Sequence, residues 1–172
     1  MIKNKYLILA AVAGFIIALD QWTKIYVHTN FTLGESVRVI KDFFNLTYVR
    51  NTGAAFGMFR EAQETFRTIF FLSIPPVAVI IILFILKGLT DKDRLQIVAL
   101  SSIFGGALGN YIDRLRFGYV IDFLDFHYKT FYTYPAFNVA DSAIVGGVIV
   151  LMVIMFQQGR QEAKEKKAQS AT

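Results

Sequence analysis

The amino-acid sequence predicts an all-α membrane protein with four transmembrane helices and a small extracytoplasmic β-rich segment between spans 1 and 2. A mean hydropathy of +0.46 and a hydrophobic content of 55% are high for a soluble domain of 172 residues. The hydrophobic residues form four blocks, each close to the ~20 residues that cross about 30 Å of hydrocarbon. A soluble bundle would need polar helix faces, and Val77–Leu86 has none.

We therefore predict a single integral membrane domain over residues 1–172. Its predicted spans are about 6–27, 67–87, 95–113 and 137–158. The first block follows Lys3 and Lys5 as a signal peptide would, but Asp20-Gln-Trp-Thr-Lys24 comes after it in place of a small-residue cleavage site. We interpret this block as a retained anchor that spans the membrane.

Two segments between spans, at about 28–66 and 114–136, are predicted to lie outside the cytoplasm. The first contains Ser36–Val49, where β-branched and aromatic residues favour strands. The second is rich in Phe and Tyr, which are typical of the membrane interface. The charged tail 159–172 is predicted to be cytoplasmic and frayed or disordered.

Basic residues predict the orientation. Nine of the 18 Lys and Arg residues lie in short segments on one side of a four-span protein. They are Lys3, Lys5, Lys87, Lys92, Arg94, Arg160, Lys164, Lys166 and Lys167. By the positive-inside rule both termini are cytoplasmic. The pI of about 9.5 then reflects charges beside the membrane. The sequence has no basic stripe interleaved with aromatic residues, so it does not indicate nucleic-acid binding.

Polar residues within the spans converge near the outer surface. With a rise of 1.5 Å per residue, Asp20 lies about 21 Å and Lys24 about 27 Å along the outward-running first span. In the third span Asn110 lies about 22 Å along, with Asp113 and Arg114 at about 27–29 Å. Asn138 and Asp141 begin the inward-running fourth span, and Asp122 lies in the outer segment before it.

These polar residues have two possible roles. The i,i+4 pair Asp20 and Lys24, and the neighbours Asp113 and Arg114, could be ion pairs that hold helices together or parts of a site. Asp122 and Asp141 have no basic neighbour in sequence, which favours a functional role. Two carboxylates brought together by adjacent spans are the minimum that an aspartyl protease needs.

Other chemistries have less support. The chain has no cysteine and two well-separated histidines, so it offers neither a thiol nucleophile nor zinc-site spacing. We expect no metal and no cofactor. The small residues at Gly105–Gly109 indicate a close-packing ridge between helices. A small proton-coupled transporter that uses acidic residues as a relay is the alternative, although such proteins often place their charges near the midplane.

Five sequence blocks together resemble the lipoprotein signal peptidase family, also called signal peptidase II, the bacterial aspartyl intramembrane proteases. The blocks are Asp20-Gln-Trp-Thr-Lys24, Asn51-Thr-Gly-Ala-Ala-Phe56, Gly105-Gly-Ala-Leu-Gly-Asn110-Tyr-Ile-Asp113-Arg114, Val120-Ile-Asp122-Phe123 and Phe137-Asn138-Val-Ala-Asp141. Their order and their placement on four spans agree with that family.

The resemblance implies a hydrolysis reaction in the bacterial cytoplasmic (inner) membrane. The enzyme would cut a diacylglyceryl-modified prolipoprotein just before its lipidated cysteine, with Asp122 and Asp141 as the catalytic pair. Supporting or substrate-binding residues would be Asp20, Lys24, Asn51, Gly53, Asn110, Asp113, Arg114 and Asn138. The implied partners are lipidated substrates, membrane lipids and inhibitory cyclic depsipeptides of the globomycin type. We expect a monomer.

Overall fold

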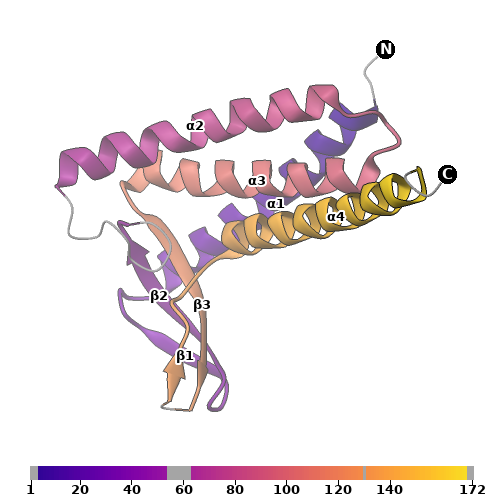
Figure 1. The fold of residues 1–172 in the computed structure, drawn as a ribbon. Helices are drawn as coiled ribbons and strands as arrows, with labels where there is room; N and C mark the ends of the chain where they lie inside the picture. The colour runs from indigo at the N-terminus through magenta and orange to yellow at the C-terminus, as the bar shows by residue number, and fades with distance from the viewer. Residues whose placement is uncertain (1–3, 54–62, 130, 170–172) are drawn as a thin grey trace.

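The computed structural model describes residues 4–53, 63–129 and 131–169. Its helices are α1 (Asn4–Asn30), α2 (Glu64–Gly88), α3 (Arg94–Phe117) and α4 (Val139–Gln169). All four are long and apolar enough to cross a membrane, which confirms the predicted fold class. The start of α1 and the end of α4 lie at one end of the bundle, and the sheet lies at the other (Figure 1).

Helix α3 lies at the centre of the bundle and packs against the other three helices. Its glycine ridge makes this possible, as the sequence predicted. A methyl group on Gly105 would lie 2.9 Å from the Cα of Ala13 in α1. One on Gly109 would lie 2.7 Å from a carboxylate oxygen of Asp20. Glycine therefore lets the backbones of α1 and α3 approach closely where the polar residues gather.

Both predicted outer segments contribute strands to one antiparallel sheet. Strands β1 (Ser36–Ile40) and β2 (Phe44–Asn51) come from the first segment, where strands were predicted over Ser36–Val49, and β2 extends two residues beyond that stretch. Strands β3 (Val120–Tyr128) and β4 (Tyr132–Thr133) come from the second, where the sequence indicated only an aromatic belt. The strand order is β1-β2-β3-β4. Non-local pairing between β2 and β3 thus joins the two segments at one end of the helix bundle.

A compact apolar cluster joins the sheet to the C-terminal end of α1. Val27 of α1, Tyr48 of β2 and Ile121 and Phe123 of β3 are all buried there. The cluster fixes β2 and β3 relative to the bundle. Each of these strands carries polar residues of the candidate site.

The predicted frayed tail is helical as far as Gln169, so that prediction was wrong. Its composition explains the difference. Ala163 and the surrounding Glu and Lys residues are strong helix formers, and Glu162 and Lys166 stand at the favourable i,i+4 spacing. A helix already formed by the fourth span needs no new nucleus to extend through this segment.

Candidate active site

Lys24, from α1, is the centre of a buried ionic cluster. Its Nζ lies 2.9 Å from the Asp20 carboxylate, 3.0 Å from that of Asp113, and donates to Asn110 Oδ1 at 2.8 Å. The side chain is only 1% exposed. An ammonium group has three protons, and each has an acceptor here, which offsets much of the cost of burying the charge.

The two carboxylates of this cluster also hold backbone from other elements. Asp20 Oδ1 accepts from the Ala140 amide at 2.9 Å, which ties the start of α4 to α1. Asp113 Oδ2 accepts from the Ile121 amide at 3.0 Å, which ties the start of β3 to α3. The cluster therefore fixes the two elements that carry Asp141 and Asp122.

Of the two possible ion pairs that the sequence left open, Asp20 and Lys24 form one, whereas Asp113 and Arg114 do not pair with each other. Asp113 pairs with Lys24, whereas Arg114 lies against Gly53, whose carbonyl oxygen is 3.3 Å from Nη2. Consecutive residues of a helix point about 100° apart, so an acid and a base that are neighbours in sequence do not face each other.

Asn110 and Asn138 connect the ionic cluster to the two candidate catalytic acids. Asn110 accepts from Lys24 and donates to Asp141 Oδ1 at 2.7 Å. Asn138 Nδ2 donates to Asp122 Oδ1 at 2.7 Å and approaches Asn110 Oδ1 at 3.2 Å. The structure thus brings the polar residues of α1, α3, β3 and α4 into one network, as their predicted depths suggested.

Asp141 belongs to a capping box at the start of α4. Its amide donates to Asn138 Oδ1 at 2.9 Å, and its own Oδ2 faces the Asn138 amide at 3.3 Å. This reciprocal arrangement satisfies two of the amides that a helix start leaves without partners. The positive end of the helix dipole favours a negative charge at this position.

Asp122 is 2% exposed and receives amide donors from two sides. Asn51 Nδ2 donates to its Oδ2 at 3.0 Å, opposite the bond from Asn138. Burial above all, and then the charge of Asp141, raise the pKa of Asp122 to about 7, against the lowering effect of Asn51, Asn138 and Lys24. Two nearby carboxylates that cannot both ionise cheaply suit acid–base catalysis.

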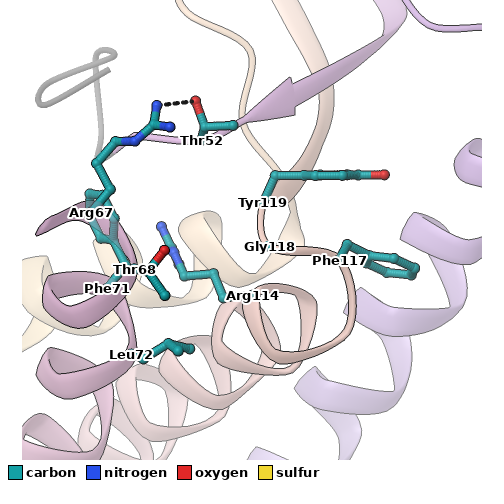
Figure 2. A pocket seen from close by; sticks show the side chains of 9 residues that line it. All are labelled: Thr52, Arg67, Thr68, Phe71, Leu72, Arg114, Phe117, Gly118 and Tyr119. Carbon is teal, nitrogen blue, oxygen red and sulfur yellow. Dashed lines mark hydrogen bonds between the residues drawn. The ribbon is translucent and has the colours of Figure 1, made fainter. Parts of the chain in front are cut away.

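A pocket of about 270 Å³ lies between the start of α2 and the end of α3. Figure 2 shows Arg67 of α2 reaching toward Thr52 and Arg114 of α3 between Phe71 on one side and Tyr119 on the other. Arg114 stacks over Phe71 at 4.8 Å. The lining residues are Thr52, Arg67, Thr68, Phe71, Leu72, Arg114, Phe117, Gly118 and Tyr119. Gly53, next to Thr52, offers its carbonyl oxygen to Arg114, which places the pocket beside the predicted site.

Sequence reasoning missed one member of the network. Gln21 Nε2 donates to Asp113 Oδ1 at 2.8 Å and to the Gly109 carbonyl at 3.1 Å. Its only signal was its place inside the block Asp20–Lys24. Part of another block, Ala54–Phe56, lies outside the described residues. Among the described residues, no group of three His, Asp or Glu side chains could hold a metal ion.

Comparisons with known proteins agree with this arrangement. A family model described as signal peptidase (SPase) II matches residues 12–157. The lipoprotein signal peptidase of Syntrophus aciditrophicus (strain SB) is 44% identical over 161 residues, covering 94% of this chain and 99% of that protein. That of Geobacter sulfurreducens is 45% identical with the same coverage. A solved bacterial membrane enzyme superposes with a TM-score of 0.77 at 34% identity, covering 88% of each chain.

Proposed function

Because the chain belongs to the signal peptidase II family, we propose that it removes signal peptides from diacylglyceryl-modified prolipoproteins with Asp122 and Asp141 as its catalytic pair. Members of this family are proteases, so the chain is a protease, and its four helices make it a multi-pass membrane protein. The comparisons give no support to the transporter alternative. The observation that best supports the catalytic pair is the network in which three asparagines, Asn51, Asn110 and Asn138, hold two carboxylates at one end of the bundle.

The proposed reaction uses both carboxylates and one water molecule. Asp141, favoured as an anion at the start of α4, removes a proton from the water, whose oxygen attacks the scissile carbonyl carbon. Asp122, which holds its proton more readily because of burial, donates that proton to the carbonyl oxygen. Collapse of the tetrahedral intermediate re-forms a carbonyl group, returns a hydroxyl proton to Asp122 and breaks the bond before the lipidated cysteine. The new amine takes the proton that Asp141 had accepted from the water.

The remaining predicted residues take supporting roles in this proposal. Lys24, Asp20 and Asp113 hold α4 and β3 so that the two acids face one site. Arg114 and Gly53, at the edge of the pocket, bind substrate backbone beside the acids. The small Gly53 permits a close backbone approach. The acyl chains of the substrate remain among membrane lipids, and cyclic depsipeptides of the globomycin type occupy the same site.

The function is tested by purified protein and two forms of one prolipoprotein. The diacylglyceryl-modified form should be cleaved just before its cysteine, and the unlipidated form should remain intact. A globomycin-type depsipeptide should block the cleavage. If both forms are cut equally, the lipid is not recognised. If neither is cut while the protein keeps its melting transition, the proposed activity is wrong.

We also propose that the chain is a monomer in the bacterial inner membrane, with both termini in the cytoplasm. Single introduced cysteines can report the orientation, because the chain has no cysteine of its own. A cysteine at Arg38, exposed on β1, should react in spheroplasts with a thiol reagent that cannot cross membranes. Cysteines at Lys92 and Glu162, both exposed, should react only after permeabilisation. Labelling of Lys92→Cys without permeabilisation would show that the proposed orientation is wrong.

A further inference from the structure

The contact between Asn51 and Asp122 depends on an irregularity in strand β2. Leu46 lies opposite Leu124 of β3, but Val49 lies opposite Asp122. Three steps along β2 therefore match two steps along β3, so β2 carries one extra residue, a β-bulge at Thr47–Tyr48. Because side chains alternate between faces, one extra residue reverses the face of every residue that follows it.

The side chains on each face agree with this bulge. Thr47 donates to Asp125 at 2.8 Å, so it lies on the face of the odd-numbered residues of β3. The next residue, Tyr48, packs on that same face with Ile121 and Phe123. Beyond the bulge, Asn51 lies opposite Val120, on the face that also carries Asp122. In a regular strand, Tyr48 would lie on the face of Asp122 and Asn51 on the opposite face.

The hydroxyl of Tyr48 is fixed by residues from two elements. His28 Nδ1, near the end of α1, lies 2.6 Å from the Tyr48 oxygen. Arg50 Nε donates to the same oxygen at 2.9 Å. Tyr119, just after the end of α3, also shares a hydrogen bond with Tyr48. Burial, and then this bond, raise the pKa of the Tyr119 hydroxyl. Tyr48 itself is 2% exposed. These contacts hold the bulged residue in the cluster between the sheet and α1.

From this geometry we infer that Tyr48 is a positioning residue for the reaction. By anchoring the bulge of β2 through its hydroxyl, it keeps Asn51 on the face of Asp122. The inference rests on the proposed function in one respect only, the catalytic role of Asp122. Tyr48 touches no substrate and acts through Asn51.

The test follows the protonation of Asp122 directly. Infrared titration of the carboxylic acid band, taken as the difference between each protein and its Asp122→Asn counterpart, gives the midpoint. The groups that face Asp122 are Asn51, Asn138, Asp141, Lys24 and Arg114. Asn51 lowers the pKa of Asp122. Asn51→Ala should therefore raise the midpoint by about one pH unit.

Tyr48→Phe keeps the buried ring and removes only the hydroxyl. It should raise the midpoint in the same direction as Asn51→Ala. The double variant should show no more than the shift of Asn51→Ala alone, since Tyr48 acts through Asn51. In the cleavage assay Tyr48→Phe should lower kcat by about tenfold with little change in KM, because a displaced Asn51 no longer orients Asp122, the proposed proton donor.

Val27→Ala is the matched control, because it trims the same buried cluster without touching the hydroxyl network. It should lower the melting temperature and leave the Asp122 midpoint unchanged. An unchanged midpoint in Tyr48→Phe, or shifts in the double variant that add, would overturn the positioning role. The infrared result needs no turnover. A chain that cleaves nothing but shows these midpoint shifts would refute the proposed function, and with it the role of Tyr48 in the reaction, while showing that Tyr48 places Asn51 against Asp122.

Discussion

Asp122→Asn and Asp141→Asn should each reduce cleavage of lipidated prolipoprotein to the uncatalysed background. In the proposed reaction each acid is needed for the same step, so the double variant should be no slower than either single one. Asparagine is nearly isosteric with aspartate and can still accept the hydrogen bonds that Asn138 and Asn110 donate. The loss should therefore appear in kcat, with the protein folded. Cleavage in detergent, run beside a melting curve, measures both quantities.

The Asp122→Asn variant should also become more stable relative to the unaltered chain as the pH rises. The pKa of Asp122 is raised by burial from an ordinary value of 3.8 to about 7. Between those values the folded protein keeps a proton that the unfolded chain releases, so the stability contributed by this group falls as pH rises through that window. Asparagine has no charge to bury. The melting temperature of the variant should rise relative to the unaltered chain from pH 4 to pH 7, and the difference should level off above pH 7.

Asp93→Asn is the control for these variants. Asp93 accepts from Thr90 in the loop between α2 and α3, at the opposite end of the bundle from the sheet. Its replacement should leave the cleavage rate unchanged. Appreciable turnover by a folded Asp122→Asn or Asp141→Asn protein would refute the catalytic pair.

The parts of the site that local chemistry determines could be predicted from sequence. The i,i+4 spacing of Asp20 and Lys24 predicts an ion pair on one helix face, and the structure has it. Asn138 and Asp141 stand at capping-box spacing at the start of an apolar run, and they form that box. Helical rise alone placed these groups at a common depth, because four spans of similar length must alternate in direction.

The parts that depend on packing could not be predicted in this way. Asp113 pairs with Lys24 of another helix, and only the glycine ridge of α3 brings them together. In strand β3 the apolar residues are interrupted by Asp122 and Asp125, so its sequence lacks the regular alternation that would indicate a strand. Only its pairing with β2 identifies it as one. The bulge at Tyr48 likewise becomes visible only when the register of two distant segments is known.

Lys24→Met should cause the largest loss of stability of any single change at the site. Methionine fills a similar volume but leaves the carboxylates of Asp20 and Asp113 without their shared cation. Removing one partner of a buried ion pair costs about 3–5 kcal/mol. The backbone amides of Ala140 and Ile121 bind these carboxylates, so α4 and β3 should loosen and cleavage should fall as well.

Asp20→Asn should be milder than Lys24→Met, since Lys24 keeps Asp113 and Asn110 as acceptors. Combining Lys24→Met with Asp113→Asn should destabilise by less than the sum of the two single changes, because the second removes a carboxylate that the first leaves unpaired. Melting curves in detergent at neutral pH measure this order, with the exposed Lys92→Met as a control that should not move. If Lys24→Met melts at the temperature of the unaltered protein, the ionic cluster does not hold α4 and β3 in place, and Asp122 and Asp141 must be positioned by the three asparagines alone.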